Sequence, residues 1–596
     1  MVRRFEMRAV FHASLACAVG MACAVEAPSP AQASDQPNPR SAVSKTWHVS
    51  TKELNVLPAE DQTRTISEAA NQVEPGDTVV IHEGVYRESV TIEKSGTTEQ
   101  PIRFEAATGE RVVITGADEI KEWRKESERE VYSASWPHRF LQWSKSGTHP
   151  DDNHHRMIGR CEQVFVRGFP LLQVFDRAAL ARGTFFADND AQRLYVRSRD
   201  GADFSNEPPL VEASTRQTLW HSKGQHVQLR GVRFRYAANM AQQGAAQFAG
   251  DHGFVEDCVF ESMNSCGASF LAKDLIVRRC VFQENGQLGF AAARAHNLLF
   301  SECVVRNNNV KGFDRGWEAG GDKLVLCRGA ILEKSQFLAN RGNGIWYDIG
   351  NEACEVRNCL IADNEDCGIF YEISYGLNAH DNVILGNGFA ATPGSWGAGA
   401  GISLSSSPSC RIERNLLIGN REGFDFREQG RTTPRIDDEK EQSIWNHDQR
   451  ILCNVIALNR DAQVWGWFDV DDGRCWPAAM QEAAEKAKGQ ESQEKSAAGL
   501  TLEKLAIAFE DNLYSARPWQ GLFHWGAEWK LHKKYAALDQ VRSELGFERG
   551  GQVLDFKVAD YPARDFRVPA DSPMLKLGCY PQGEVPGVRL GTIPVR

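Results

Sequence analysis

The chain has 596 residues, of which 42% are hydrophobic and 25% charged, so it is long enough for more than one compact core and has a globular composition. Its formal net charge of -11 argues against a nucleic-acid partner, which requires a basic surface, and gives no attraction to an anionic membrane surface. The 51 glycines fit a fold with many turns.

The first 33 residues have the pattern of a secretion signal. A short basic segment precedes an apolar stretch at 9–25, and a small-x-small cleavage site ends at Ala33. We therefore expect residues 1–33 to be removed and the mature protein to be secreted or periplasmic. No later apolar run approaches the ~20 residues that a membrane-spanning helix needs, so we expect no membrane insertion.

Two segments precede the regular part of the chain. Residues 47–118 are expected to form the N-terminal turns of a β-solenoid, with a short helix at 65–70 that caps its open end. Residues 119–212 contain short alternating strands separated by turn residues and lack the rhythm of the later sequence. We predict that this second segment is an inserted, sandwich-like β module.

Residues 213–468 contain an internal repeat of about 23 residues. Each repeat starts with a small or polar residue and two apolar ones, and an asparagine usually follows five residues after the start. The spacings of 22, 23, 32, 24, 23, 33 and 39 residues define a short coil with surface insertions. The starts are Cys258, Cys280, Cys303, Ser335, Cys359, Asn382, Asn415 and Asn454. The pattern predicts an all-β fold, a right-handed parallel β-helix of the pectin-lyase type, whose coils stack ~4.8 Å apart and align their asparagines in a ladder.

The repeat also explains most cysteines. Thirteen of the 15 follow Ala33, and an odd number in a secreted protein invites a disulfide interpretation. Four of them instead occupy one column of the repeat, together with asparagines. We predict that Cys258, Cys280, Cys303 and Cys359 are stacked core residues without disulfides.

The end of the chain, residues 469–596, has no clear period. A charged stretch at 478–495 is predicted to be a helical excursion into solvent, and the remaining C-terminal segment has no specific prediction.

One strand of each coil opens with a glycine and separates into inward and outward columns. Its first and third positions are apolar in successive coils and must point inward, so the second and fourth positions point outward. In two neighbouring coils the second column holds Trp346 and Phe370, and the fourth holds Asp348 and Glu372. The preceding coil is widely spaced, and its opening glycine places Lys323 in the second column beside Trp346.

Asp348 and Glu372 are 24 residues apart, which is one coil. Stacking at ~4.8 Å puts their carboxyl groups roughly 5 Å apart, and a retaining glycosidase has its two carboxyl groups ~5–5.5 Å apart. Outward acids on a β-helix are often only solvated, but like charges stacked directly cost stability. The neighbouring coils carry Ala293 and Ser405 in that column, so this face is not generally acidic. The adjacent Trp346 and Phe370 offer a surface on which a sugar ring can stack.

Three motifs, Gly-Trp-Glu-Ala-Gly-Gly-Asp-Lys at 316–323, Gly-Ile-Trp-Tyr-Asp at 344–348 and Gly-Ile-Phe-Tyr-Glu-Ile-Ser at 368–374, resemble the β-helix β-xylosidases of glycoside hydrolase family 120. The resemblance implies that Asp348 is the nucleophile and Glu372 the acid/base. It also implies a β-sandwich module within the solenoid, which suits residues 119–212. The motifs cover about sixty residues, so the reaction class transfers better than the sugar. The candidate substrate-binding residues are Trp317, Glu318, Lys323, Trp346, Phe370 and Ser374.

We therefore predict a secreted retaining glycoside hydrolase that acts on a plant or algal oligo- or polysaccharide. No cofactor or catalytic metal is required, although a structural Ca²⁺ ion fits this kind of fold. Insertions near 144–156, 309–320 and 388–400 predict a walled pocket, which favours exo action.

Two alternatives remain open at this stage. In a polysaccharide lyase or uronate epimerase, Lys323 or Arg427 would be the base or clamp, and Asp348 and Glu372 would hold Ca²⁺. Ultraviolet absorbance of an unsaturated product would identify the lyase. In a non-catalytic carbohydrate-binding or structural solenoid, Asp348→Asn and Glu372→Gln would leave all measurable behaviour intact.

Overall fold

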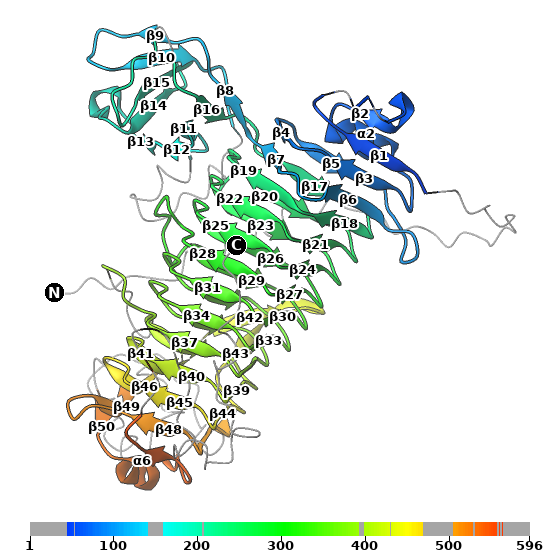
Figure 1. Cartoon of the computed structure of the whole chain (residues 1–596). Helices are drawn as coiled ribbons and strands as arrows, with labels where there is room; N and C mark the ends of the chain where they lie inside the picture. The colour runs from blue at the N-terminus through cyan, green and yellow to red at the C-terminus, as the bar shows by residue number, and fades with distance from the viewer. Residues whose placement is uncertain are drawn as a thin grey trace, which may run out of the picture.

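The structure is a computed structural model that describes residues 44–52, 54–55, 57–140, 159–205, 208–392, 398–428, 431–468, 505–527, 531–556, 560 and 563. The predicted signal segment 1–33 and the predicted helical excursion at 478–495 lie outside these residues. The described strands stack along one axis as a parallel β-helix (Figure 1). The predicted all-β solenoid is thus confirmed.

Each regular coil contributes one strand to each of three long sheets, which we call A, B and C. Sheet A contains β2 (Gln62–Thr63), β1 (Thr46–Val49), β3 (Thr78–Ile81), β6 (Ile102–Ala106), β18 (Val227–Arg230), β21 (Phe254–Glu256), β24 (Ile276–Arg278), β27 (Leu299–Ser301), β30 (Ile331–Glu333), β33 (Glu355–Arg357), β36 (Asn378–His380), β39 (Arg411–Glu413), β44 (Arg450–Leu452) and β47 (Ala508–Glu510). Sheet B contains β4 (Gly84–Tyr86), β7 (Val112–Thr115), β19 (Val232–Arg235), β22 (Val259–Glu261), β25 (Val281–Gln283), β28 (Val304–Arg306), β31 (Gln336–Leu338), β34 (Leu360–Ala362), β37 (Val383–Leu385), β40 (Leu416–Ile418), β45 (Val455–Ala457), β48 (Leu513–Ser515) and β51 (Gln552–Val553). Sheet C contains β5 (Val90–Ile92), β17 (Trp220–Ser222), β20 (Gly244–Phe248), β23 (Cys266–Phe270), β26 (Leu288–Ala293), β29 (Gly320–Val325), β32 (Ile345–Asp348), β35 (Ile369–Glu372), β38 (Ala400–Ser405), β41 (Glu422–Glu428), β46 (Ala462–Phe468), β49 (Gly521–Ala527) and β50 (Leu531–Tyr535).

Two smaller sheets are formed by residues 117–214, between the early coils and the main stack. One contains β12 (Phe169–Pro170), β11 (Val164–Val166), β16 (Val211–Ser214) and β8 (Ala117–Glu119). The other contains β13 (Leu172–Gln173), β14 (Thr184–Asp188), β15 (Arg193–Arg197), β10 (Tyr132–Ser135) and β9 (Arg124–Lys125), and the 3-10 turn η2 (Arg177–Ala179) lies between β13 and β14. These sheets enclose their own apolar cluster, which includes Tyr132, Trp136 and Phe185. This is the part of the chain predicted to be an inserted module.

Buried asparagine side chains tie successive coils together. The Asn364 Nδ2 group donates to Asn387 Oδ1 at 2.9 Å and to the Phe337 carbonyl at 3.0 Å. Its Oδ1 accepts from the backbone and side chain of Asn340 at 3.0 and 2.9 Å. Each amide thus satisfies backbone and side-chain groups that would otherwise be buried unpaired. The predicted ladder is confirmed.

The predicted cysteine column is also confirmed. Cys258, Cys280, Cys303 and Cys359 are all buried free thiols. Their sulfurs lie near backbone carbonyls of the turns; Cys303 Sγ, for example, lies 3.2 Å from the Ser301 carbonyl. They therefore fill the core as small apolar residues.

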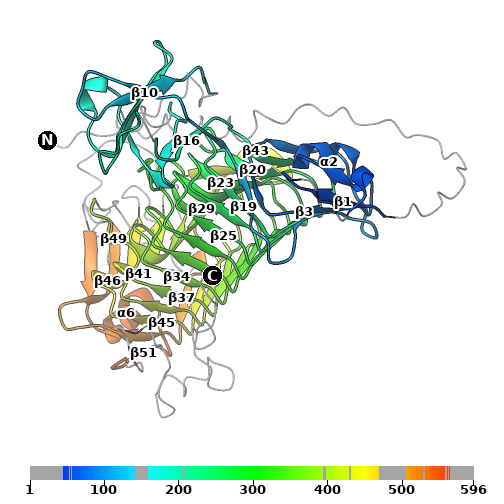
Figure 2. The same ribbon diagram turned by 45° about the horizontal axis from the view of Figure 1, so that its top comes forward.

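The two ends of the stack are covered by short helices, α2 (Ile66–Gln72) and α6 (Leu538–Leu545), seen at opposite ends in Figure 2. The predicted cap helix begins with a reciprocal capping box between Thr65 and Glu68. The 3-10 turn η1 (Ala59–Asp61) precedes it.

The β-helix extends beyond its predicted end at residue 468. β47, β48 and β49 each pair in parallel with the strands of the preceding coil. Asn512 extends the asparagine column, since its Oδ1 accepts from the Asn454 backbone at 2.8 Å. The prediction missed this coil because Asn512 is 58 positions after Asn454, and this long spacing hides the period.

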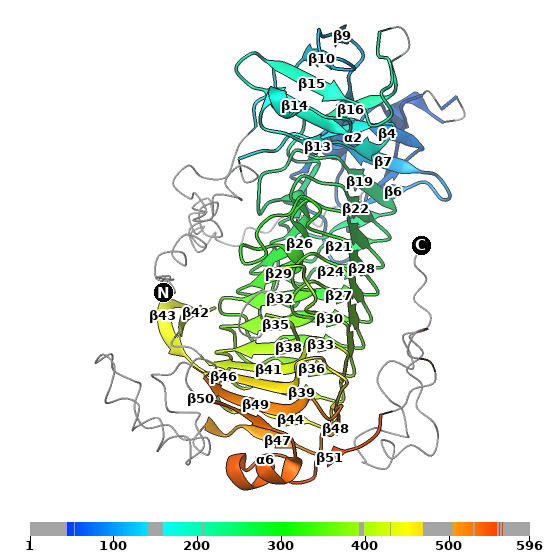
Figure 3. The ribbon, with the colours of Figure 1, turned by 90° about the vertical axis from the view of Figure 1, so that its left-hand side faces the viewer.

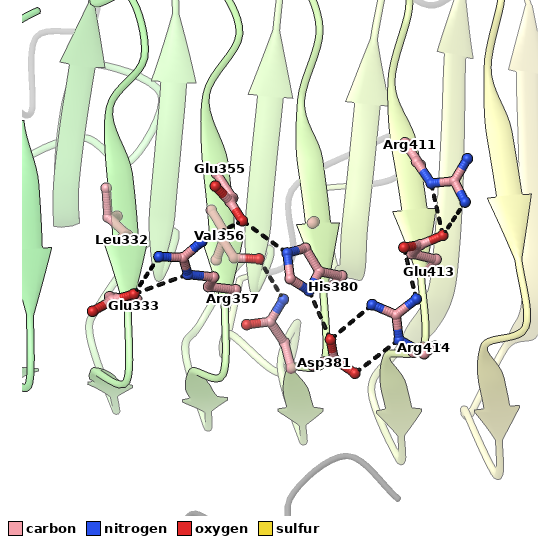
Figure 4. A network of polar contacts seen from close by, with 12 residues as sticks. Leu332, Glu333, Glu355, Val356, Arg357, His380, Asp381, Arg411, Glu413 and Arg414 are labelled. Carbon is pink, nitrogen blue, oxygen red and sulfur yellow. Dashed lines mark hydrogen bonds and ion pairs between the residues drawn. The ribbon is translucent and has the colours of Figure 1, made fainter. Parts of the chain in front are cut away.

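The outer face of sheet A carries a row of ion pairs that cross from coil to coil (Figure 4). Arg357 pairs with Glu333 on the preceding strand at 2.6 Å. His380, at the end of β36, bonds Glu355 at 2.8 Å and Asp381 at 2.7 Å. These contacts offset the repulsion that stacking like charges would cause.

Candidate active site

Adjacent strands of sheet C place the two predicted catalytic acids side by side. Trp346 is in register with Phe370, and Tyr347 with Tyr371, so Asp348 at the end of β32 lies next to Glu372 at the end of β35. Adjacent strands are ~4.8 Å apart. The two tyrosines are fully buried and anchor both strands in the core, which fixes the outward direction of the acids.

The aromatic pair predicted beside the acids is present. The ring centroids of Trp346 and Phe370 are 5.7 Å apart, and the rings are tilted by 34°. Trp346 is buried and Phe370 is half-buried. The indole Nε1 of Trp346 has no hydrogen-bond partner among the described residues, so it is a buried donor that a ligand could satisfy.

Lys323 on β29 joins three of the predicted site residues. Its Nζ lies 2.9 Å from Asp348 Oδ2, 2.9 Å from Glu318 Oε1 and 4.4 Å from the Trp346 ring centroid. The lysine side chain is only 5% exposed. Burial lowers the pKa of Lys323, but Asp348 and Glu318 outweigh that effect and raise it, so the amine stays charged.

The two acids have opposite electrostatic surroundings. Burial raises the pKa of Asp348, and Glu372 raises it further, while Lys323 opposes both. Burial would also raise the pKa of Glu372, but Arg431 and Arg427 outweigh it and lower this pKa. The Arg431 guanidinium lies 2.8 Å from Glu372 Oε1. In this arrangement the pKa of Asp348 is therefore raised and that of Glu372 lowered.

Arg431 is the main residue that the sequence prediction missed. It begins β42 (Arg431–Arg435), which pairs antiparallel with β43 (Asp438–Ile444) as a hairpin outside the coil. Figure 3 shows this hairpin standing beside the strands of sheet C. Its only signal in the sequence is the long 39-residue spacing of that coil, which indicates an insertion but not where its side chains point.

Ser374, which the sequence predicted to bind substrate, lies behind the strand end that carries Glu372. Ile373 has a left-handed backbone with φ of 38°, so the chain turns immediately after Glu372. The Ser374 hydroxyl is fully buried, donates to the Glu372 carbonyl at 2.8 Å and accepts from Asn351 Nδ2 at 3.0 Å. Ser374 is therefore part of a turn ladder that supports Glu372 from behind.

Trp317, which was also predicted to bind substrate, is buried. It packs with Ala241, Phe313 and Ala319 in a small apolar cluster. Its neighbour Glu318 reaches Lys323, so Trp317 fixes the loop that delivers Glu318. Its predicted contact with a sugar has no support in this arrangement.

Asp322 is a second residue that the prediction missed. It occupies an inward column, where other coils have apolar residues, and burial raises its pKa well above the usual range. Its Oδ1 accepts from the Trp346 backbone N–H at 3.0 Å. The Asp322 side chain thus takes the backbone N–H of Trp346, which in a regular ladder would bond a carbonyl of the neighbouring strand. This contact links β29 to β32 where Lys323 lies beside Trp346, and it helps to position these two residues.

Among the residues that the structure describes, no three histidine, cysteine, aspartate or glutamate side chains gather as metal ligands. No helix among the same residues has the length and apolarity needed to cross a bilayer.

Comparisons with known proteins agree with the fold. The family model described as a right handed beta helix region matches residues 181–321, 245–417 and 324–447, and a chondroitinase B model matches 61–125. A solved structure of XylC in complex with xylose is similar over 81% of this chain and 86% of that chain, with 16% identity and a TM-score of 0.58. Two further structures are more distant. One, described as a glycoside hydrolase, has 11% identity and a TM-score of 0.42, and the match covers 88% of this chain and 99% of that chain. The other, a mannuronic acid specific family 6 polysaccharide lyase from human gut microbiota, has 12% identity and a TM-score of 0.41, and the match covers 82% of this chain and 87% of that chain. The curated proteins include no match. The chain thus has a right-handed β-helix fold like that of the family 120 enzymes.

Proposed function

We propose that this protein is a retaining glycoside hydrolase with β-xylosidase-like chemistry, in which Asp348 and Glu372 are the catalytic pair. The observation that carries the proposal is the placement of these two acids on adjacent strands of sheet C, with Lys323 bound to Asp348. Spacing by one coil suits the short carboxylate separation of retaining enzymes. The likeness to a xylose-bound β-helix protein supports the fold and motivates the choice of first substrate.

In the proposed reaction, an Asp348 carboxylate oxygen attacks the anomeric carbon. The glycosidic C–O bond breaks, and Glu372 gives its proton to the leaving oxygen. A water then attacks the anomeric carbon of the glycosyl ester, transfers a proton to Glu372 and releases the Asp348 carboxylate. Lys323 lowers the pKa of Asp348 against the effect of burial, which favours the ionised nucleophile. Lys323 and Glu318 would hold sugar hydroxyls, while Trp346 and Phe370 would contact the ring.

A screen of 4-nitrophenyl glycosides tests the activity, with the β-xyloside as the first substrate. We expect cleavage with net retention, seen by NMR as initial release of the same anomer. If no aryl glycoside or oligosaccharide is cleaved, the hydrolase proposal is wrong. The appearance of ultraviolet-absorbing unsaturated products from uronate polymers would instead support a lyase.

Azide rescue tests the assignment of the two acids. Asp348→Gly should be inactive, and azide should restore turnover of an activated aryl glycoside with a glycosyl azide of inverted configuration. Glu372→Gly with azide should give the azide of retained configuration, because Asp348 still forms the intermediate. The reverse pattern would exchange the two roles.

A further inference from the structure

One inward position of sheet C carries an acid, Asp322, which is only 1% exposed. The residues of the same column in the neighbouring coils are all apolar: Ala268, Phe290, Ile345, Ile369, Ile402 and Phe424. The Asp322 Oδ1 accepts from the Trp346 backbone N–H at 3.0 Å, whereas its Oδ2 has no hydrogen-bond partner among the described residues. Burying a carboxyl group with an unpaired oxygen costs stability, so packing does not explain an acid at this position.

The ladder between β29 and β32 is interrupted at this acid. On the preceding side, the pairing of β29 with β26 includes both Asp322 and Lys323. On the following side, β29 pairs with β32 only through Leu324 and Val325, and an isolated bridge joins Gly320 to the same coil. The two strands are thus joined before and after Asp322 and Lys323 but not at them. The Asp322 carboxyl group supplies the contact across this gap.

Lys323 lies at the gap and depends on it for its path to the nucleophile. Its Nζ is 2.9 Å from Asp348 Oδ2, although Val325, and not Lys323, is in register with Asp348. The lysine side chain therefore runs diagonally past Trp346, and its Nζ lies 4.4 Å from the centroid of that ring. This diagonal path depends on where the β29 backbone stands relative to Trp346, which is what the bond from Asp322 fixes.

We propose that Asp322 is a positioning residue of the active site, retained in the core at a cost in stability because it sets the placement of Lys323 against Asp348. This inference rests on the proposed hydrolase function. An apolar side chain at position 322 cannot accept the Trp346 N–H. The two strands would then either leave that N–H unpaired or close to regular pairing, and either change moves Lys323 relative to the nucleophile. A residue that breaks a core pattern without a gain in packing is expected at a functional site.

Two substitutions separate positioning from packing. Asp322→Leu fits the apolar column and removes the buried acid, so it should be at least as stable as the wild type in urea denaturation. Its kcat/KM for the aryl glycoside selected by the screen should fall about ten- to a hundredfold, the effect of a misplacement of about 1 Å. Asp322→Asn keeps an acceptor for the Trp346 N–H and should retain most of the activity. Ile402→Leu, a conservative change in the same column, is the control and should leave kcat/KM unchanged.

The pH profile gives a readout that packing alone would not change. Moving Lys323 away from Asp348 weakens the effect by which the lysine lowers the pKa of Asp348. Glu372 and Arg431 also act on that carboxyl group, and neither substitution alters them. The acid limb of kcat/KM should therefore move to higher pH in Asp322→Leu and stay in place in Asp322→Asn. An unmoved acid limb in Asp322→Leu would overturn the inference.

The remaining outcomes separate the two proposals. A lower urea midpoint for Asp322→Leu than for the wild type, or an unchanged kcat/KM, would refute the proposed role of Asp322 and leave the hydrolase proposal intact. If the wild type cleaves no glycoside, the hydrolase proposal fails, and calorimetry with free xylose then tests Asp322. We expect weaker binding to Asp322→Leu than to Asp322→Asn, because Lys323 and Trp346 belong to the candidate sugar site. Equal binding to both variants would refute the role of Asp322 even without cleavage.

Discussion

Replacing Lys323 with methionine removes the cation that holds two carboxylates in a largely buried site. Each N–O distance of 2.9 Å corresponds to about 6 kcal/mol of attraction at an effective dielectric constant of about 20. Much of this is offset by the cost of burying the charges, so we expect a net loss of about 3–5 kcal/mol in the free energy of unfolding at neutral pH. Lys323→Arg, which keeps the charge, should lose less.

The same change should move the pH dependence of activity. Lys323 lowers the pKa of Asp348, so its removal raises that pKa, and the nucleophile ionises only at higher pH. A net effect of 3 kcal/mol corresponds to about two pH units on the acid limb of kcat/KM. Activity of Lys323→Met should therefore be lost at a higher pH than that of the wild type and should partly recover as the pH rises further. The destabilisation should also be smaller at low pH, where the carboxylates are protonated in both folded and unfolded states.

Urea denaturation and a pH profile of aryl-glycoside cleavage are the measurements. Lys334→Met is the control, since Lys334 is exposed and lies 3.9 Å from Glu333, which ends a strand of sheet A. The reasoning is refuted if Lys323→Met leaves the acid limb unmoved and raises only KM. In that case Lys323 would bind a sugar hydroxyl without tuning Asp348.

Three further changes test separate parts of the structure. Asn364→Ala should destabilise the fold by about 3–5 kcal/mol, because it leaves several buried hydrogen-bonding groups without partners. The control Asn71→Ala, at an exposed position, should be within about 0.5 kcal/mol of the wild type. Equal urea midpoints for the two variants would contradict a stabilising role of the asparagine ladder. Ser374→Ala should lower stability by about 1–2 kcal/mol and leave KM unchanged, and a raised KM with unchanged stability would restore Ser374 to the substrate site. Asp381 and Glu355 raise the pKa of His380 above its ordinary 6.5, so the stabilising contribution of His380 is complete below pH 6.5 and is lost as the pH rises through the folded-state pKa. His380→Gln should therefore remove this part of the pH dependence of the free energy of unfolding, measured by urea denaturation. An unchanged pH dependence would mean that it arises from other groups.

The pair of acids could be predicted from sequence because the fold is periodic. Once the coil length is known, residues 24 positions apart must be neighbours, and alternation along the strand decides which side chains point outward. Asp348, Glu372, Trp346 and Phe370 follow from these two rules, and the same reasoning places Lys323 beside Trp346. Backbone hydrogen bonding between coils leaves little freedom to depart from this register.

The chain between or beyond regular coils follows no such rule. Arg431 reaches Glu372 from a hairpin inserted after β41, and its position depends on how the hairpin folds back over sheet C. Ser374 turns inward because Ile373 adopts a left-handed backbone, which the alternation of a strand does not anticipate. The coil at β47 to β49 was missed because a long insertion separates Asn512 from its neighbour in the ladder. The sequence by itself thus determined the repeat, the core columns and the acid pair, since these depend on local periodicity. Only the tertiary structure decided which cations face each acid, because that depends on contacts between segments with no fixed spacing.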